Sequence, residues 1–161
     1  MHCIEPHRDI GGRTARSLLA GALVWLTLPV SAQTPQPPLP TVELQAGIHV
    51  IRAELADTPA SQTVGLMYRR RLDGNDGMLF VFERAEAHCF WMRNTLIPLS
   101  IAFLDEDGTV VNIARMMPRS DDTHCAQRPV RHALEMSQGW FEKRGVAPGD
   151  RLRAPGVFRA R

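Results

Sequence analysis

Short hydrophobic segments separated by turn-forming residues run through most of the chain, a pattern typical of a strand-rich domain. Residues 48–55 are β-branched at their start and alternate between hydrophobic and polar positions towards their end, as a half-buried strand does. Later segments are short, hydrophobic and bounded by charged, glycine or proline residues. They predict further strands at residues 77–82, 88–92, 99–104, 110–116 and 133–136.

Helical signals are few, and the clearest follows the first predicted strand. Thr58 followed by Pro59 is typical of an N-cap with proline at the first helical position. Hydrophobic residues then recur at helical spacing, at Ala60, Val64 and Met67. One short helix is predicted there.

The remaining local signals complete the domain. Residues 105–108, Asp-Glu-Asp-Gly, lie between two predicted strands and are typical of a hairpin loop, because glycine tolerates the positive φ that closes such loops. A helical turn is predicted near residues 140–144, and residues 148–150, Pro-Gly-Asp, predict a turn that leads into Leu152. We therefore expect a mainly β (α+β) fold with one or two short helices.

The N-terminus carries the pattern of a secretory signal. Three arginines precede an uncharged hydrophobic stretch over residues 18–30, and small residues follow at Ser31 and Ala32. The stretch is shorter than the roughly 20 residues that span a bilayer. We expect cleavage after Ala32, removal of residues 1–32 as a signal peptide, no stable membrane insertion afterwards, and a periplasmic location. The alternative is an uncleaved anchor that tethers the same domain to the membrane.

A proline-rich segment follows the predicted cleavage site. Its prolines, Pro35, Pro37, Pro38 and Pro40, favour an extended polyproline conformation that builds no core. We expect a linker over residues 33–41. The whole chain has 161 residues, which is room for one domain, and we expect a single strand-rich domain over residues 42–161.

The charge balance argues against nucleic acid as a partner. The whole chain has a formal net charge of +2. Removal of residues 1–32, which hold three arginines and two acidic residues, leaves about +1. Nucleic-acid binding needs a basic surface that displaces counterions from phosphates. The basic run Arg69-Arg70-Arg71 is short, and we interpret it as a solvated face.

Several motifs in a fixed order resemble those of the domain of unknown function 192 family (DUF192). The similarity spans about residues 48–152, and the motifs are Gly65-Leu66-Met67, Gly77-Met78-Leu79-Phe80, Trp91-Met92-Arg93-Asn94-Thr95 with Pro98, Ala133-Leu134-Glu135 and Pro148-Gly149-Asp150. The resemblance implies a compact β-sandwich-like or jelly-roll-like fold with a short helix, often behind a signal peptide. It implies no established reaction. Ser100 departs from the family, which commonly has aspartate at this position, so a family activity that needs this carboxylate would be missing.

The cysteines predict a disulfide. Cys3 leaves with the signal peptide, so the mature domain keeps Cys89 and Cys125, an even number in an oxidising compartment. We expect a structural bond between them, because the chain has no Cys-x-x-Cys motif. Each cysteine follows a histidine, which raises a metal site as an alternative. In strands, however, adjacent side chains point to opposite faces, so we expect no metal and no cofactor.

The segment from Trp91 to Thr95 is the main candidate binding site. Trp91 provides a flat apolar surface, Arg93 can pair with a carboxylate or phosphate, and Asn94 both donates and accepts hydrogen bonds. With Thr95, these side chains suit the rim of a ligand site. The alternative is structural: Trp91 fills the core, and Asn94 and Thr95 hold a turn through bonds to the backbone.

Glu135 lies in a short hydrophobic segment, where a carboxylate is costly to bury unless it is paired. Arg93 or Arg69 is a candidate partner, and either pairing would shape a polar pocket. The alternative is that strand alternation points Glu135 to solvent.

These observations favour a non-enzymatic periplasmic module that binds a small molecule, glycan or peptide around Trp91, Arg93, Asn94, Thr95, Glu135 and Arg69. A hydrolase-type envelope enzyme with Glu135 as acid or base is the alternative from another class. A structural partner of another envelope protein is a third.

Overall fold

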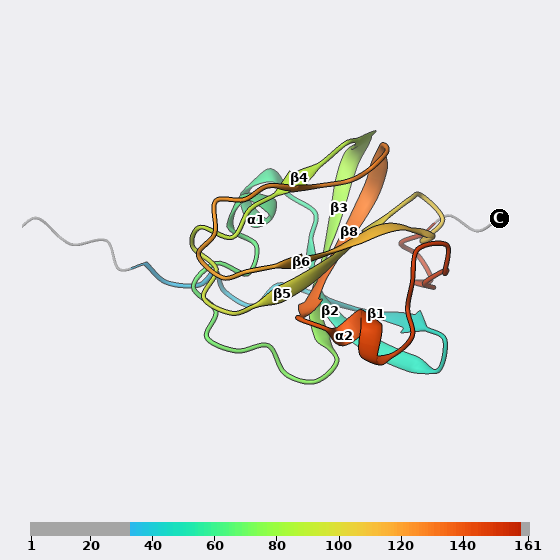
Figure 1. Ribbon diagram of the computed structural model, residues 1–161, viewed down its shortest axis with the longest axis horizontal. Coiled ribbons are helices and arrows are strands. Elements are labelled where there is room, and N and C mark those ends of the chain that lie inside the picture. Colours follow the sequence, from blue (N-terminus) through green and yellow to red (C-terminus); the bar gives the residue numbers. More distant parts are fainter. Residues whose placement is uncertain (1–32, 159–161) are drawn as a thin grey trace, which may run out of the picture. The chain divides into compact units, whose positions relative to one another are not determined.

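The chain is built around one mixed sheet of six strands, shown in the computed structural model of Figure 1. The structure describes residues 33–158, so the predicted signal peptide lies outside the described residues. In chain order the described elements are β1 (Thr41–Ala46), β2 (His49–Ala56), α1 (Pro59–Val64), β3 (Asp76–Glu86), β4 (Cys89–Phe90), β5 (Leu99–Leu104), β6 (Val110–Met116), β7 (His124–Cys125), β8 (Val130–Ser137) and α2 (Trp140–Lys143). This confirms the mainly β class with two short helices in one domain.

The sheet has the strand order β1-β2-β3-β8-β5-β6, and β4 pairs with β7 in a separate two-stranded sheet. Strands β2 and β3 are parallel, and the other pairs are antiparallel. A parallel pair needs a crossover connection, and the segment that contains α1 supplies it. Residues 105–108 close the β5–β6 hairpin as predicted, with Gly108 at a φ of 82°.

Hydrophobic residues cover both faces of the sheet. Alternate residues of β5 contribute to two separate clusters, so Ala102 and Leu104 pack on one face while Ile101 and Phe103 pack on the other. The first cluster includes α2, which Figure 1 shows beside β1. The second cluster includes Leu66, just after α1. The central strands are therefore buried on both sides, which explains the nearly continuous hydrophobic sequence of β5.

The proline-rich segment contacts the domain. The side chain of Gln36 donates hydrogen bonds to the carbonyl oxygens of Ser61 (3.2 Å) and Gly65 (2.8 Å). The backbone N–H of Leu39 donates to Glu54 (2.9 Å). Strand β1 begins at Thr41, the last residue of the predicted linker. The ordered domain thus includes residues that composition alone assigned to a linker.

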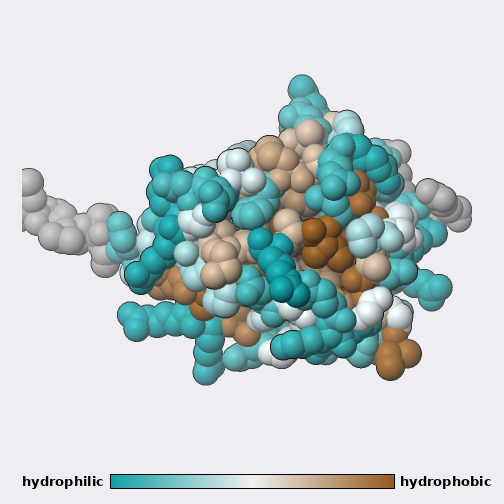
Figure 2. Space-filling model, viewed as in Figure 1, coloured by the Kyte–Doolittle hydropathy of each residue, from teal (hydrophilic) through white to brown (hydrophobic). Residues whose placement is uncertain are grey.

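Figure 2 shows one face of the molecule, on which hydrophilic side chains separate several hydrophobic patches. The large hydrophobic side chains exposed within residues 33–158 are Ile48, Val50, Trp91 and Met117. Among those residues, no helix has the length and hydrophobicity needed to cross a bilayer.

Candidate functional site

A cavity of about 270 Å³ lies beside α1 and β4 and has Glu135 in its lining. We call it the Glu135 cavity. Residues from four parts of the chain surround it: α1 and the turn after it, β3, the segment around β4, and β8. The lining residues are Gln62, Thr63, Val64, Gly65, Leu66, Met67, Phe80, Phe82, His88, Cys89, Phe90, Trp91, Thr95 and Glu135.

Helix α1 forms one wall, and local interactions fix its ends. Thr58 and Ser61 form a reciprocal capping box at its start. The helix ends at Val64, and Gly65 caps it with a φ of 50°, where glycine avoids the strain of a positive φ. A Cβ atom on Gly65 would lie 3.3 Å from the ring of Phe80. The side chain of Gln62 donates to the carbonyl oxygen of Val81 (2.7 Å) and so ties the helix to β3.

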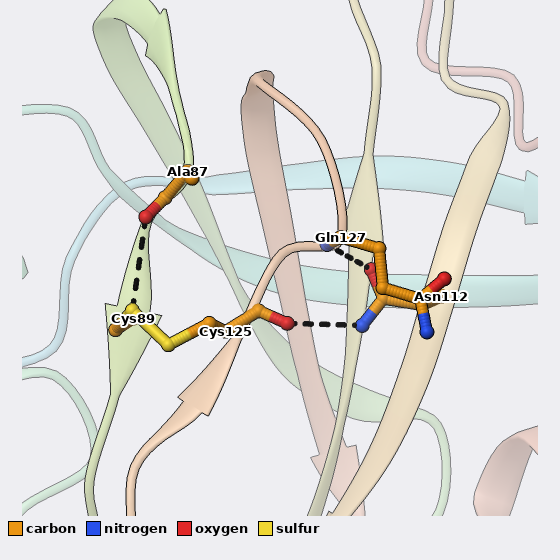
Figure 3. Close-up of a disulfide and its surroundings, with 5 residues drawn as sticks. All are labelled: Ala87, Cys89, Asn112, Cys125 and Gln127. Atoms are coloured by element: carbon orange, nitrogen blue, oxygen red, sulfur yellow. Dashed lines mark hydrogen bonds between the residues drawn. A yellow bond between two sulfur atoms is a disulfide. The ribbon is translucent and has the colours of Figure 1, made fainter.

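The opposite wall is the segment around β4, which a disulfide holds to β7. Cys89 and Cys125 are bonded across the two-stranded sheet, in the pairing expected from the sequence. Asn112 of β6 fixes the β7 side: its amide donates to the carbonyl oxygen of Cys125 (3.1 Å), and its oxygen accepts from the N–H of Gln127 (3.1 Å) (Figure 3). The described residues include no group of three His, Cys, Asp or Glu that could hold a metal ion.

The segment after β4 places Trp91 and Thr95 at the cavity. Trp91 is 38% exposed, whereas the neighbouring Met92 is buried in the second hydrophobic cluster. The alternative in which Trp91 fills the core is therefore wrong, and Met92 takes that place. Thr95 is buried, and its N–H donates to the carbonyl oxygen of Met92 (2.9 Å), which closes the turn.

Glu135 points from β8 into the same cavity. Its cross-strand neighbours, Met78 of β3 and Ile101 of β5, are fully buried. The side chain is only 5% exposed, and no residue between 33 and 158 forms a hydrogen bond or ion pair with its carboxyl group. Burial raises the pKa of Glu135 from its ordinary value of 4.5 to about 8. The carboxyl group is therefore mostly protonated at neutral pH.

The predicted arginine partners of Glu135 are bound elsewhere. Arg69 donates to Glu54 at 2.8 Å, and it lines a second cavity of about 500 Å³. Arg93 donates to Asp121 at 2.6 Å, with both side chains largely exposed. The expectation that either arginine pairs with Glu135 is wrong, because Arg69 pairs with Glu54 of β2 and Arg93 pairs with Asp121.

The other predicted residues support the cavity from outside. The guanidinium of Arg93 lies 4.2 Å from the ring centroid of Trp91. The carbonyl oxygen of Asn94 accepts from the N–H of Tyr68 (2.9 Å), and its side-chain amide contacts the sulfur of Met67. Trp91, Thr95 and Glu135 thus meet in one cavity, while Arg93 and Asn94 lie around it and Arg69 does not take part.

Sequence reasoning did not assign the aromatic lining. Phe80 and Phe90 pack edge to face with ring centroids 4.9 Å apart, and Phe82 stacks on His88 at 3.6 Å. The alternation of Phe80 and Phe82 indicated that they share one face of β3. Nothing local indicated that β4 would fold over that face.

Ser100 lies away from this cavity. It pairs with Met136 on the face of the first hydrophobic cluster, and its hydroxyl accepts a hydrogen bond from the N–H of Gly139 (3.0 Å), just before α2. Position 100 thus supports the start of α2. Ser100 is not part of the lining of the Glu135 cavity.

The fold and site together define a small, mainly β domain with one buried acid in an aromatic cavity. The family model of DUF192, described as an uncharacterized ACR, matches residues 41–154, and the chain belongs to this family. Among curated proteins, none matches the sequence.

Two solved structures are similar to this chain. One, from Sinorhizobium meliloti 1021, is described as a putative transcription regulator. It is 34% identical with a TM-score of 0.71, and the alignment covers 76% of this chain and 99% of that one. The other, a protein of unknown function from Novosphingobium aromaticivorans DSM 12444, is 37% identical with a TM-score of 0.69, over 77% and 94% of the two chains.

Proposed function

We propose that this protein is exported to the periplasm and binds a small molecule in the Glu135 cavity without transforming it. The observation that carries the proposal is the buried carboxyl group of Glu135, which has no partner within residues 33–158. Proteins normally satisfy buried polar groups, and a mostly apolar cavity with a few convergent polar groups is the usual form of a ligand site. A ligand would supply the missing partner.

The disulfide supports the export part of the proposal. Such bonds persist in oxidising compartments and are rare in the cytosol, and the Cys89–Cys125 bond accompanies an N-terminal signal pattern. The full chain expressed in a Gram-negative host should appear in the periplasmic fraction with Gln33 as its first residue. N-terminal sequencing of the purified protein tests this, and an intact N-terminus in the cytosolic fraction would contradict it.

Binding can be tested with a neutral aromatic probe. Benzyl alcohol should perturb the NMR signals of Leu66, Trp91 and Thr95 in a saturable way. Thr63→Trp adds an indole at the exposed rim of the cavity and should weaken this binding. Lys143→Trp, an exposed position on the other helix, is the matched control and should leave it unchanged. Equal perturbation of all three proteins, or signals that move mainly outside the cavity, would refute the assignment.

An acid–base enzyme is the second candidate, because a carboxyl group with its pKa raised to about 8 suits proton transfer near neutral pH. Glycoside hydrolysis usually needs two carboxyl groups, and the lining described for this cavity contains Glu135 alone. We therefore place binding first. Release of soluble fragments from purified peptidoglycan, abolished in Glu135→Gln, would reverse the order.

The description of the Sinorhizobium structure raises nucleic-acid binding as a further possibility for this chain. The charge distribution argues against it. Around the second cavity, Arg52 and Arg71 pair with acidic residues, at 2.8 and 3.4 Å, as does Arg69. Cations that are already paired bind phosphate weakly, because each new contact must displace an existing partner. A gel shift with random-sequence duplex DNA at physiological salt should show no complex.

A further inference from the structure

We propose that the ligand of the Glu135 cavity carries an organic ammonium group, which pairs with the Glu135 carboxylate while an apolar body packs on the aromatic wall. This inference rests on the proposed binding function and specifies the chemistry of the ligand. Its basis is the geometry of the cavity: one unpartnered acid at the buried side, and aromatic rings around it.

The charged groups of the cavity lining favour a cation. Glu135 is the only acidic residue in the described lining, and that lining holds no lysine or arginine. The other titratable group is His88. Its Nε2 lies 3.2 Å from the carbonyl oxygen of Arg84, which requires Nε2 to be the donor, and its ring stacks on Phe82 at 3.6 Å. Among residues 33–158, no side chain pairs as a cation with the acid, so a ligand cation meets no competitor from this part of the chain at the carboxyl oxygens.

The aromatic rings add a second attraction. The faces of aromatic rings carry partial negative charge and attract cations within about 6 Å of the centroid. Trp91 already has one such contact, since the guanidinium of Arg93 lies 4.2 Å from its ring centroid. Phe80, Phe82 and Phe90 surround the interior with apolar surface. Aromatic walls and one carboxylate are together complementary to an alkyl- or arylammonium ion.

The size of the cavity limits the ligand. A volume of about 270 Å³ is slightly below the roughly 300–1,000 Å³ of sites for drug-sized ligands. A primary amine with a single apolar group fits this description. A long peptide or glycan would have to leave most of its length outside, so only a terminal group would enter.

Pairing with a cation requires the ionised form of Glu135. Because the free carboxyl group is mostly protonated below pH 8, binding of an ammonium ion in this range releases a proton. Affinity should therefore rise with pH, by up to about tenfold per pH unit, and level off above the pKa of the free site. A ligand that instead accepts a hydrogen bond from the protonated acid would show constant affinity below pH 8 and weaker binding above it.

The test compares benzylamine with benzyl alcohol, which has a hydroxyl in place of the ammonium group. Isothermal titrations are run from pH 6 to 8, where benzylamine stays protonated as lysine does. At pH 8, benzylamine should bind the unmodified protein about tenfold or more tightly than benzyl alcohol. Glu135→Gln should remove this preference, and Glu43→Gln, an exposed glutamate on β1, should retain it.

The outcomes separate the inference from the proposed function. If the two probes bind equally well, or if benzylamine affinity does not rise with pH, the ammonium assignment is wrong. In that case, cavity binding of benzyl alcohol that Thr63→Trp weakens would still support the proposed function. If neither probe binds, both proposals fail. The pH series uses the unmodified protein, so the test does not depend on how well any variant folds.

Discussion

Replacing Glu135 with glutamine should remove a large pH dependence of stability. The pKa of the folded group is about 8 against an ordinary value of 4.5, so folding favours the protonated carboxyl group. Its contribution to the free energy of unfolding is complete below pH 4.5 and is lost as the pH rises to about 8. The loss is about 1.4 kcal/mol per pH unit, or roughly 5 kcal/mol across the whole window.

Glutamine has nearly the same shape and does not ionise, so Glu135→Gln should lack this loss. We expect the variant and the unmodified protein to have similar stability near pH 4.5, with the variant gaining an advantage of several kcal/mol by pH 8. Urea unfolding followed by circular dichroism at half-unit pH steps measures the difference. The pKa of buried His132 is lowered, mainly by desolvation, but it titrates in both proteins and cancels in the comparison.

Glu43→Gln provides the control, because the carboxyl group of Glu43 is exposed on β1. The stability of this variant should follow that of the unmodified protein at every pH. Parallel pH profiles for Glu135→Gln and the unmodified protein would show that the carboxyl group is solvated or paired in solution. The reasoning from burial, and the binding proposals that depend on it, would then be refuted.

Three structural predictions follow from the scaffold, each measured by urea unfolding. Replacing Cys89 and Cys125 with serine should cost about 4 kcal/mol, because the bond closes a loop with a sequence separation of 36 residues; an unchanged midpoint would exclude this role. Gly77→Ala should cost about 1–3 kcal/mol, since a Cβ would meet Met136 Sδ, and full stability would mean that β3 and β8 separate easily. Asn112→Ala should cost about 1–3 kcal/mol by leaving a backbone carbonyl and an N–H without their partner. Unchanged stability would show that water replaces the amide at no cost and would contradict this prediction.

Local sequence signals predicted the strands that pack on both faces. The limits of β5 and β6 match the predicted ranges, because each is a mostly hydrophobic segment with acidic, glycine or proline residues close to its ends. The short helix begins at Pro59 as predicted, but it ends at Val64. The helical spacing that extended to Met67 stops at Gly65, where the backbone takes a positive φ.

Pairing between distant segments could not be predicted in the same way. Strand β1 alternates buried residues at Leu44 and Ala46 with exposed ones, but its start overlaps the proline-rich segment and its partner is β2. The predicted strand at residues 88–92 is reduced to the two residues of β4, because Met92 bonds instead to the backbone of Ser120. These contacts depend on tertiary structure, which one sequence does not specify locally.

Glu135 shows where an energetic argument from sequence was incomplete. That argument allowed a buried carboxylate with an arginine partner, or an exposed one, because burying an unpaired charge is costly. The structure has a third solution, in which burial raises the pKa of Glu135 and the group stays neutral near pH 7. Such a group is tolerated in the interior as a neutral acid, and the proposed ammonium ligand would shift it to the charged form.

The proposed export and the proposed ligand binding are linked through the disulfide. The β4 segment supplies Phe90 and Trp91 to the Glu135 cavity, yet β4 pairs with β7 over only two residues. An isolated pair of strands this short has little stability of its own, so the Cys89–Cys125 bond and the Asn112 hydrogen bonds together hold this segment in place. The complete site should therefore form best in an oxidising compartment. A reduced form would keep Glu135, Phe80 and Phe82 on the central sheet but would hold Phe90 and Trp91 less firmly.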